Sequence, residues 1–251
     1  MIMKQPNKQA DPIIEISSLQ KSFGENHVLN DFNLSIKKGE NVVVLGKSGC
    51  GKSVLIKCII GLLDYDSGSI NVLGKQISDL KQHDLDELRS RIGFVFQSSA
   101  LYDSMTVREN LEFPLRRHGK HKSKEEINNL VKETLENVGL FHAIDLMPAE
   151  LSGGMRKRIG LARALILHPE IMLYDEPTTG LDPITAREII NLMLDVKEKY
   201  NTTSIIISHD LRCAKLTADR LTVLMDGKNY MEGAFDELKS INDPNTRPFF
   251  E

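Results

Sequence analysis

One short glycine-rich stretch constrains this chain more than any other feature: Gly46-Lys47-Ser48-Gly49-Cys50-Gly51-Lys52-Ser53. It fits the pattern G-x-x-x-x-G-K-[ST], it follows the β-branched run at 42–45, and it precedes a helical pattern over 52–63. In that setting, glycines let backbone N–H groups curl around phosphates, and the helix N-terminus adds partial positive charge. We expect Lys52 to reach the phosphates and Ser53 to ligate Mg²⁺. The stretch therefore predicts a nucleotide-phosphate site between a buried strand and a helix.

Strand-like and helical patterns alternate along the rest of the chain. Strands are expected at 13–16, 28–36, 42–45, 69–73, 92–96, 171–174, 204–207 and 221–225, and helices at 52–63, 124–138 and 184–200. From about 98 to 169 helical patterns replace strand patterns, which indicates a helical subdomain inserted into an α/β core. The alternation predicts a mainly parallel sheet covered by helices. One domain is expected at 12–240, with a frayed tail at 1–11 and a C-terminal tail at 241–251.

Charge, hydropathy and cysteine content exclude several classes of protein. The 32 basic and 35 acidic residues give a net charge of -3, which argues against a nucleic-acid-wrapping protein. The longest apolar runs fall far short of the roughly 20 residues that span a bilayer, and the polar start is unlike a secretory signal, so a cytoplasmic protein is expected. The cysteines Cys50, Cys58 and Cys213 form no C-x-x-C pair, so they are interpreted as small apolar fillers.

Two carboxylates and a histidine follow expected core strands. Asp175 and Glu176 come directly after the strand at 171–174, at the edge where open α/β sheets bind ligands. Asp175 is predicted to hold Mg²⁺ through water, and Glu176 to orient or deprotonate the attacking water, a contribution of about 10²- to 10⁴-fold in rate. His209 follows the strand at 204–207, and its position alone leaves a structural role and a γ-phosphate contact equally open.

A second candidate anion site lies in the helical insert, at Leu151-Ser152-Gly153-Gly154-Met155. Ser152 is expected to cap a helix whose first N–H groups are opened by two glycines. Alone, this stretch is equally well an ordinary capped helix start. The basic run Arg156-Lys157-Arg158 that follows is interpreted as a solvated helix face.

Taken together, these motifs make the chain resemble the ATP-binding cassette (ABC) ATPases over nearly its whole length. Phe23 matches the aromatic residue that stacks on adenine, Gln97 the glutamine that senses the γ-phosphate, and 151–155 the signature motif. Asp182 matches the loop that couples the two sites of a dimer, and His209 the switch histidine. The resemblance implies a P-loop NTPase core with an antiparallel β N-terminal region and an inserted α-helical subdomain.

The resemblance also implies ATP hydrolysis with Mg²⁺ by a head-to-tail homodimer that sandwiches two ATP molecules. The implied nucleotide contacts are Phe23, Gly46, Lys47, Ser48, Gly49, Cys50, Gly51, Lys52, Ser53, Val54, Ser152, Gly153 and Gly154. The implied catalytic residues are Glu176, His209, Gln97 and Lys52, and the implied metal ligands are Ser53, Gln97 and Asp175.

Finer details resemble the phospholipid-trafficking subgroup of Mla-type cassettes. The resemblance lies in the segments 46–54 and 96–102 and in the tail 242–250. It also lies in Met155, a position at which most cassettes carry glutamine. Lys47 and Tyr102 depart from the arginine and phenylalanine common in that subgroup. The subgroup implies phospholipid transport that maintains lipid asymmetry. As the energising subunit of a membrane transporter, the chain is expected to bind membrane permease subunits through a groove near 97–102 and to lie at the cytoplasmic face of the plasma membrane. The sequence leaves open whether a small regulatory subunit binds and whether the cargo is a different one. The alternative function is that of a soluble assembly factor, such as one for iron–sulfur clusters.

Overall fold

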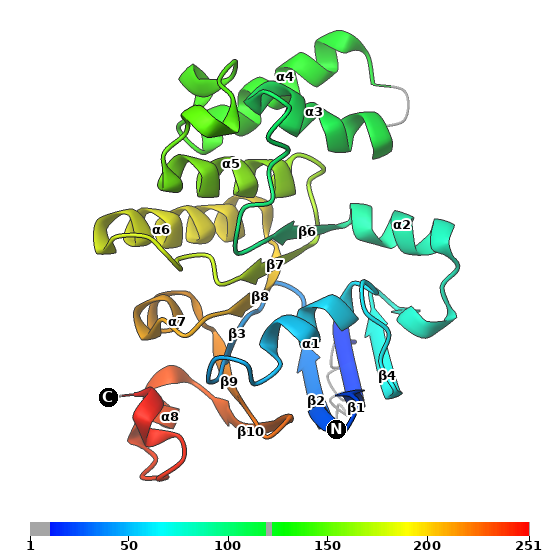
Figure 1. Ribbon diagram of the computed structural model, residues 1–251, viewed down its shortest axis with the longest axis vertical. Helices are drawn as coiled ribbons and strands as arrows, with labels where there is room; N and C mark the ends of the chain where they lie inside the picture. The colour runs from blue at the N-terminus through cyan, green and yellow to red at the C-terminus, as the bar shows by residue number, and fades with distance from the viewer. Residues whose placement is uncertain (1–10, 119–121, 251) are drawn as a thin grey trace, which may run out of the picture.

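The computed structural model describes residues 11–118 and 122–250 and contains two sheets with helices around them (Figure 1). One sheet has the strand order β2-β1-β4-β5, and the other has the order β10-β9-β3-β8-β7-β6. Helices α3 and α4 lie at one end of the molecule, and the antiparallel sheet lies toward the other (Figure 1). Residues 1–10 of the expected N-terminal tail lie outside the described residues.

The first sheet is antiparallel, as expected from the family resemblance. Its strands are β1 (Ile14–Phe23), β2 (Asn26–Ile36), β4 (Ser67–Val72) and β5 (Lys75–Gln76). In β1, Ile14 pairs with Ile36 of β2 and with Val72 of β4. β1 runs well past the expected 13–16, because pairing on both sides extends it through polar residues that have no apolar alternation. The antiparallel N-terminal region is confirmed.

The second sheet carries the glycine-rich loop and is mainly parallel. Its strands are β3 (Asn41–Leu45), β6 (Ile92–Val95), β7 (Ile171–Asp175), β8 (Thr203–Ile207), β9 (Arg220–Met225) and β10 (Lys228–Gly233). Only β10, at the edge, is antiparallel to its neighbour. β3 lies near the middle and all five of its residues are buried. Val42 and Val44 pack toward the antiparallel sheet, while Val43 and Leu45 pack toward the opposite helical layer, as expected for a strand buried on both faces.

The helical insert lies between β6 and β7 and has a core of its own. It contains α3 (Val107–His118), α4 (Lys124–Asn137) and α5 (Gly153–Leu165). Ser123 caps α4 by accepting a 3.2 Å hydrogen bond from the Glu126 amide, and the Glu126 side chain bonds the Ser123 amide at 2.6 Å. Leu111, Val131 and Ile159 are fully buried among the apolar faces of these helices. The expected helical insertion is confirmed.

The remaining helices are α1 (Lys52–Ile59), α2 (Gln82–Ser90), α6 (Pro183–Tyr200), α7 (Leu211–Thr217) and α8 (Phe235–Ser240). The sequence prediction missed α2, α7, α8, β5 and β10, all short or weakly periodic. No helix in the described ranges is long and apolar enough to cross a membrane. The three cysteines are free thiols, and two of them are buried.

The chain end returns to the core instead of leaving it. Phe250 is 9% exposed and packs edge-on against Phe235, with ring centroids 5.6 Å apart. Asp243 holds this return by accepting hydrogen bonds from the Asn245 and Thr246 amides and from the Tyr230 hydroxyl. The expected division into a domain at 12–240 and a tail at 241–251 stays a prediction.

Candidate nucleotide-binding site

The glycine-rich loop joins the buried strand β3 to the helix α1. Gly51 has φ +105°, and a Cβ there would lie 2.6 Å from Val28 Cγ1 and 2.9 Å from the Val28 carbonyl oxygen. Only glycine allows both this backbone conformation and this close packing. No side chain caps α1, so its first N–H groups are available to an anion, as the sequence pattern predicts.

The Lys52 side chain folds back into this loop and is buried. Its ammonium donates to the carbonyl oxygens of Gly46, at 2.7 Å, and Lys47, at 2.9 Å, and lies 3.9 Å from Cys50 Sγ. A buried ammonium needs such partners. The loop therefore holds a positive charge at the place where phosphates are expected.

Asp175 ends β7 beside the start of α1. The Ser53 hydroxyl donates a 3.1 Å hydrogen bond to Asp175 Oδ1. Burial raises the pKa of Asp175, and the charge of Glu176 adds to this, while the bond from Ser53 opposes it. A hydroxyl and a carboxylate oxygen suit Mg²⁺, which binds few protein ligands and otherwise holds water and phosphate oxygens. No cluster of three or more His, Cys, Asp or Glu within 11–118 and 122–250 offers a metal site, so a cation here would depend on this pair and on the substrate.

The next carboxylate, Glu176, is held by two side chains. His209 Nδ1 lies 2.7 Å from Glu176 Oε2, and the Thr179 hydroxyl donates to the same oxygen at 3.0 Å. Glu176 has φ +51°, a conformation that a non-glycine residue keeps only where its surroundings hold it. Its amide also donates to the Ile207 carbonyl of β8 at 3.0 Å. Backbone and side chain are thus both fixed at the sheet edge.

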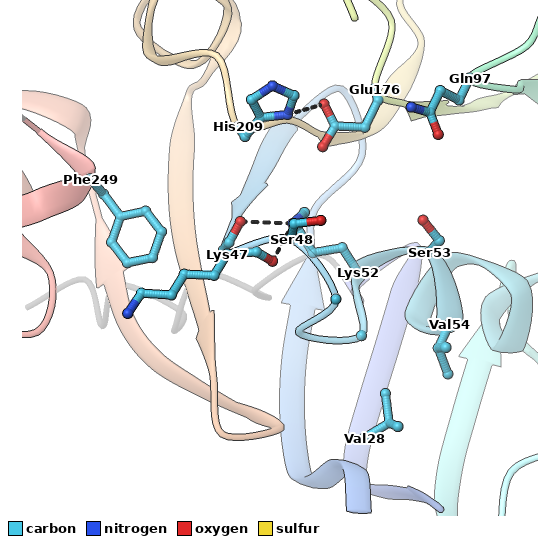
Figure 2. A pocket seen from close by; sticks show the side chains of 13 residues that line it. Val28, Lys47, Ser48, Lys52, Ser53, Val54, Gln97, Glu176, His209 and Phe249 are labelled. Atoms are coloured by element: carbon cyan, nitrogen blue, oxygen red, sulfur yellow. Dashed lines mark hydrogen bonds and ion pairs between the residues drawn. The ribbon is translucent and has the colours of Figure 1, made fainter. Parts of the chain in front are cut away.

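Glu176, His209, Lys52 and Ser53 line one pocket of about 600 Å³, a volume in the range of small-molecule sites. His209, Glu176 and Gln97 lie along one side of it, and Lys52 and Ser53 lie along the other (Figure 2). The pocket is lined by Val28, Gly46, Lys47, Ser48, Gly49, Gly51, Lys52, Ser53, Val54, Gln97, Glu176, His209 and Phe249.

Some expected contacts lie outside this lining. Phe23, the predicted adenine-stacking residue, is 49% exposed at the end of β1. Cys50 lines an adjoining pocket of about 340 Å³, and Asp175 lies buried behind Ser53. Their roles in nucleotide binding stay predictions.

Sequence reasoning missed two residues of the lining, Val28 and Phe249. Val28 carries no motif and is recognisable only from its contact with Gly51. Phe249 lies beside Lys47 at the pocket (Figure 2), because the chain end returns there from about 200 residues away. No local pattern could have placed it.

The predicted signature and coupling residues meet in a different hollow. Ser152 caps α5 by accepting a hydrogen bond from the Met155 amide at 3.2 Å, and Asp182 caps α6 by accepting from the Ile184 and Thr185 amides. The Thr185 hydroxyl also donates to Asp182, and this bond, together with the two amide bonds, lowers the pKa of Asp182. The hollow, of about 540 Å³, is lined by Gly139, Leu140, His142, Ser152, Gly153, Gly154, Met155, Arg158, Gly180, Leu181, Asp182, Thr185 and Glu188. None of these residues lines the phosphate pocket, so one chain does not bring the two predicted anion sites together.

Comparison with known proteins decides which family has this arrangement. The family model described as "ABC transporter" matches residues 29–179. The chain belongs to the ABC transporter family. ABC cassettes hydrolyse ATP to drive transport, so this chain is an ATPase.

Curated relatives of this ABC cassette differ in their cargo. It is 41% identical over 236 residues to the probable ribonucleotide transport ATP-binding protein mkl of Mycobacterium leprae, covering 94% of this chain and 68% of that protein. It is 39% identical over 231 residues to the intermembrane phospholipid transport system ATP-binding protein MlaF of Haemophilus influenzae. This match covers 92% of this chain and 87% of that protein. It is 39% identical over 241 residues to the methionine import ATP-binding protein MetN of Campylobacter jejuni. This match covers 90% of this chain and 72% of that protein.

Solved cassettes share the fold. The dimeric post-hydrolysis structure of the cassette MJ0796 bound to ADP and Pi has a TM-score of 0.81 and 32% identity, covering 88% of this chain and 98% of that one. The cbiO1 subunit of the cbiONQ transporter from Clostridium perfringens has a TM-score of 0.82 and 31% identity, covering 90% of each chain. The predicted ABC ATPase fold is thereby confirmed.

Proposed function

We propose that this cassette is the ATP-hydrolysing subunit of a membrane transporter that moves phospholipid between membranes. The observation that carries the ATPase part is the pocket in which Glu176 and His209 face the Lys52 loop (Figure 2). The membrane partners, the cargo and a position at the cytoplasmic face of the plasma membrane are inferences beyond this geometry.

Residues in and around the pocket have proposed roles in ATP binding and hydrolysis. Lys52 and the loop amides bind the β- and γ-phosphates, and Gln97 contacts the γ-phosphate end. Ser53 and Asp175 would hold Mg²⁺, which neutralises phosphate charge when bound. Glu176 accepts a proton from the attacking water, while His209 holds the Glu176 carboxylate and contacts the γ-phosphate. Phe23 is proposed to stack on the adenine.

We propose that two copies complete each ATP site. The hollow at Ser152 and Asp182 is separate from the phosphate pocket, so the signature residues of a second copy are needed to cover the ATP bound to the first. A C₂ pair places both sites in the same contact. The similar MJ0796 cassette is dimeric with ADP and Pi bound, which supports this arrangement.

A second pocket, of about 520 Å³, is the proposed permease groove. Tyr102 packs on Phe113 there, with ring centroids 4.9 Å apart, and Phe94 packs on Phe96 at 4.0 Å. Tyr102 is 43% exposed. Aromatic residues are frequent anchors in interfaces, and the charged side chains of Asp86, Arg89, Arg117 and Arg163 line the same groove, so it suits a partner segment with both apolar and charged residues. The groove begins where the segment 97–102 leaves the ATP site, so it is placed to connect the partner to the nucleotide.

The phospholipid cargo rests on the subgroup resemblance at 46–54, 96–102 and Met155. The relative MlaF, whose name assigns it to phospholipid transport, supports this cargo. The relatives mkl and MetN carry the competing ribonucleotide and methionine cargoes at similar identity. An ATPase subunit does not touch the cargo, so the test must recover the whole transporter.

The test is a pull-down of tagged Glu176→Gln protein from detergent-solubilised native membranes with ATP present. Mass spectrometry identifies co-eluting proteins and lipids, and tagged Lys52→Ala protein is the control. A multi-span membrane protein with enriched phospholipid supports the proposal, and a small soluble partner in the same complex would be a regulatory subunit. A permease without lipid refutes the cargo. Recovery with soluble partners only refutes the transporter and favours an assembly factor.

A further inference from the structure

Lys157 is a buried cation in a basic run that the sequence predicted to be a solvated face. That prediction is wrong for this residue, because Lys157 is only 7% exposed, whereas its neighbour Arg156 is exposed. A buried ammonium costs free energy unless hydrogen bonds compensate it. Its partners therefore indicate why it is there.

Both partners are backbone carbonyls at the ATP site. The Lys157 ammonium donates to the carbonyl oxygen of Gln97 at 2.6 Å and to that of Glu176 at 3.3 Å. These residues follow the adjacent parallel strands β6 and β7, and both line the phosphate pocket. One ammonium thus bridges the two chain segments that carry the predicted γ-phosphate sensor and the predicted base.

Lys157 belongs to the helix α5, which begins at the signature glycines. The same helix contacts the segment after Gln97 at two further points. Gly160 approaches Ser99 so closely that a Cβ would lie 3.1 Å from the Ser99 Cβ. Arg163 donates to the carbonyl oxygens of Ala100, at 2.7 Å, and Ser99, at 3.2 Å. The signature helix therefore holds the segment 97–100 from one end to the other.

The backbone that is held is not in a relaxed conformation. Ser99 has φ +63°, Ala100 has φ +46° and Glu176 has φ +51°, and non-glycine residues keep such conformations only where their surroundings impose them. Hydrogen bonds from a cation are stronger than those from a neutral donor, so Lys157 is suited to impose the conformation at Glu176, and Arg163 those at Ser99 and Ala100.

We propose that Lys157 is a positioning residue that fixes the backbone at Gln97 and Glu176 and so couples the signature helix to the catalytic end of the ATP site. It does not line the pocket, so it acts through these two residues. The proposal rests on the proposed roles of Gln97 and Glu176 in hydrolysis. It predicts that Lys157 affects turnover more than ATP affinity.

The test compares Lys157→Met, which removes the donors, with Lys157→Gln, which keeps a neutral N–H donor. Lys215→Met is the matched control, since it removes the same charge from an exposed position on α7. We expect Lys157→Met to lower kcat about tenfold, as for a loss near 1.4 kcal/mol, with the KM for MgATP changed less than about threefold. Lys157→Gln should recover part of the kcat, and the control should match the wild type.

Hydrogen exchange read by mass spectrometry separates positioning from a general loss of stability. We expect faster exchange in Lys157→Met confined to 97–102 and 176–180. A kcat within twofold of the wild type, or faster exchange spread evenly over the protein, overturns the proposal. If Lys157→Met does not fold, Lys157→Gln takes both measurements with the same expected directions. Glu176→Gln measured in parallel shows separately whether the proposed base is correct.

Discussion

Nδ1 of His209 lies 2.7 Å from Oε2 of Glu176, although the imidazole is 64% exposed and the carboxylate only 12% exposed. The Thr179 hydroxyl bonds the same oxygen. Both interactions engage Oε2, so Oε1 is the oxygen that can accept a proton from an attacking water. The pair thus joins the sheltered carboxylate that is proposed as the base to a residue that reaches the open side of the pocket, where a second copy is proposed to close.

Glu176→Gln is expected to abolish most turnover while ATP still binds. The amide keeps the shape of the side chain but is a far weaker base, and a general base contributes about 10²- to 10⁴-fold in rate. The Lys52 loop, which is expected to bind the phosphates, is untouched. Phosphate release measures turnover, and size-exclusion chromatography with ATP should show an accumulated dimer. Hydrolysis near the wild-type rate would show that the assignment of the base is wrong.

Lys52→Ala is the contrasting variant. It removes the ammonium that donates to the Gly46 and Lys47 carbonyls, so ATP binding and ATP-dependent dimerisation should be lost together. Equilibrium binding of ATP checks this. A Lys52→Ala protein that binds ATP normally but does not turn over would contradict the phosphate-binding role.

A double-mutant cycle tests whether His209 and Thr179 act on one oxygen. His209→Ala and Thr179→Val should each lower kcat, because each removes a partner that orients the Glu176 carboxylate. The double variant should lose less than the product of the two single losses, since contacting residues are not additive. Independent effects would mean that His209 acts on the nucleotide alone. The measurement is kcat for the four proteins at saturating MgATP.

The sequence predicted those parts of the site that follow from strand order. Asp175 ends the buried strand β7, Glu176 follows it, and His209 lies two residues after the buried strand β8. Parallel strands bring their carboxyl ends to one edge of the sheet. Lys157 was misjudged because burial depends on Gln97 and Glu176, which lie far from it in the chain. A local run of basic residues does not predict such long-range contacts.

Several short elements of the confirmed fold were missed for a related reason. The short helices α2 and α7 and the edge strand β10 have too few residues for a clear period, and packing against the sheet decides their conformation. Phe249 reaches the pocket because the C-terminal segment folds back, with Asp243 accepting a hydrogen bond from Tyr230 and Phe250 packing on Phe235. These are tertiary contacts that no local pattern contains.

Tyr102→Glu is expected to release the cassette from its membrane partner. The change removes the ring that packs on Phe113 and on the Arg163 guanidinium, and it places a carboxylate where binding of the partner would desolvate it. Phe141→Glu is the matched control, since Phe141 is 42% exposed against 43% for Tyr102 and does not line that groove. Recovery of cassette in the membrane fraction is the measurement. Equal recovery of the two variants would place the groove elsewhere.

Asp175→Asn is expected to stabilise the nucleotide-free protein near neutral pH. Burial and the charge of Glu176 raise the pKa of Asp175 above its ordinary value of 3.8. Between that value and the raised one, the folded state binds more protons than the unfolded state, so this group makes the free energy of unfolding fall as pH rises. Asparagine removes the charge and still accepts the hydrogen bond from Ser53.

The urea midpoint of Asp175→Asn should therefore exceed that of the wild type at pH 7.5, and the difference should shrink as pH falls through the raised pKa toward 3.8. Asp145→Asn, at an exposed position, should show no such pH-dependent difference. MgATP should stabilise the wild type more than Asp175→Asn, because the variant lacks a proposed metal ligand. If Asp175→Asn is less stable than the wild type at pH 7.5, the Asp175 carboxylate stabilises the folded protein. Its burial would then not be explained by the cation that it is proposed to hold.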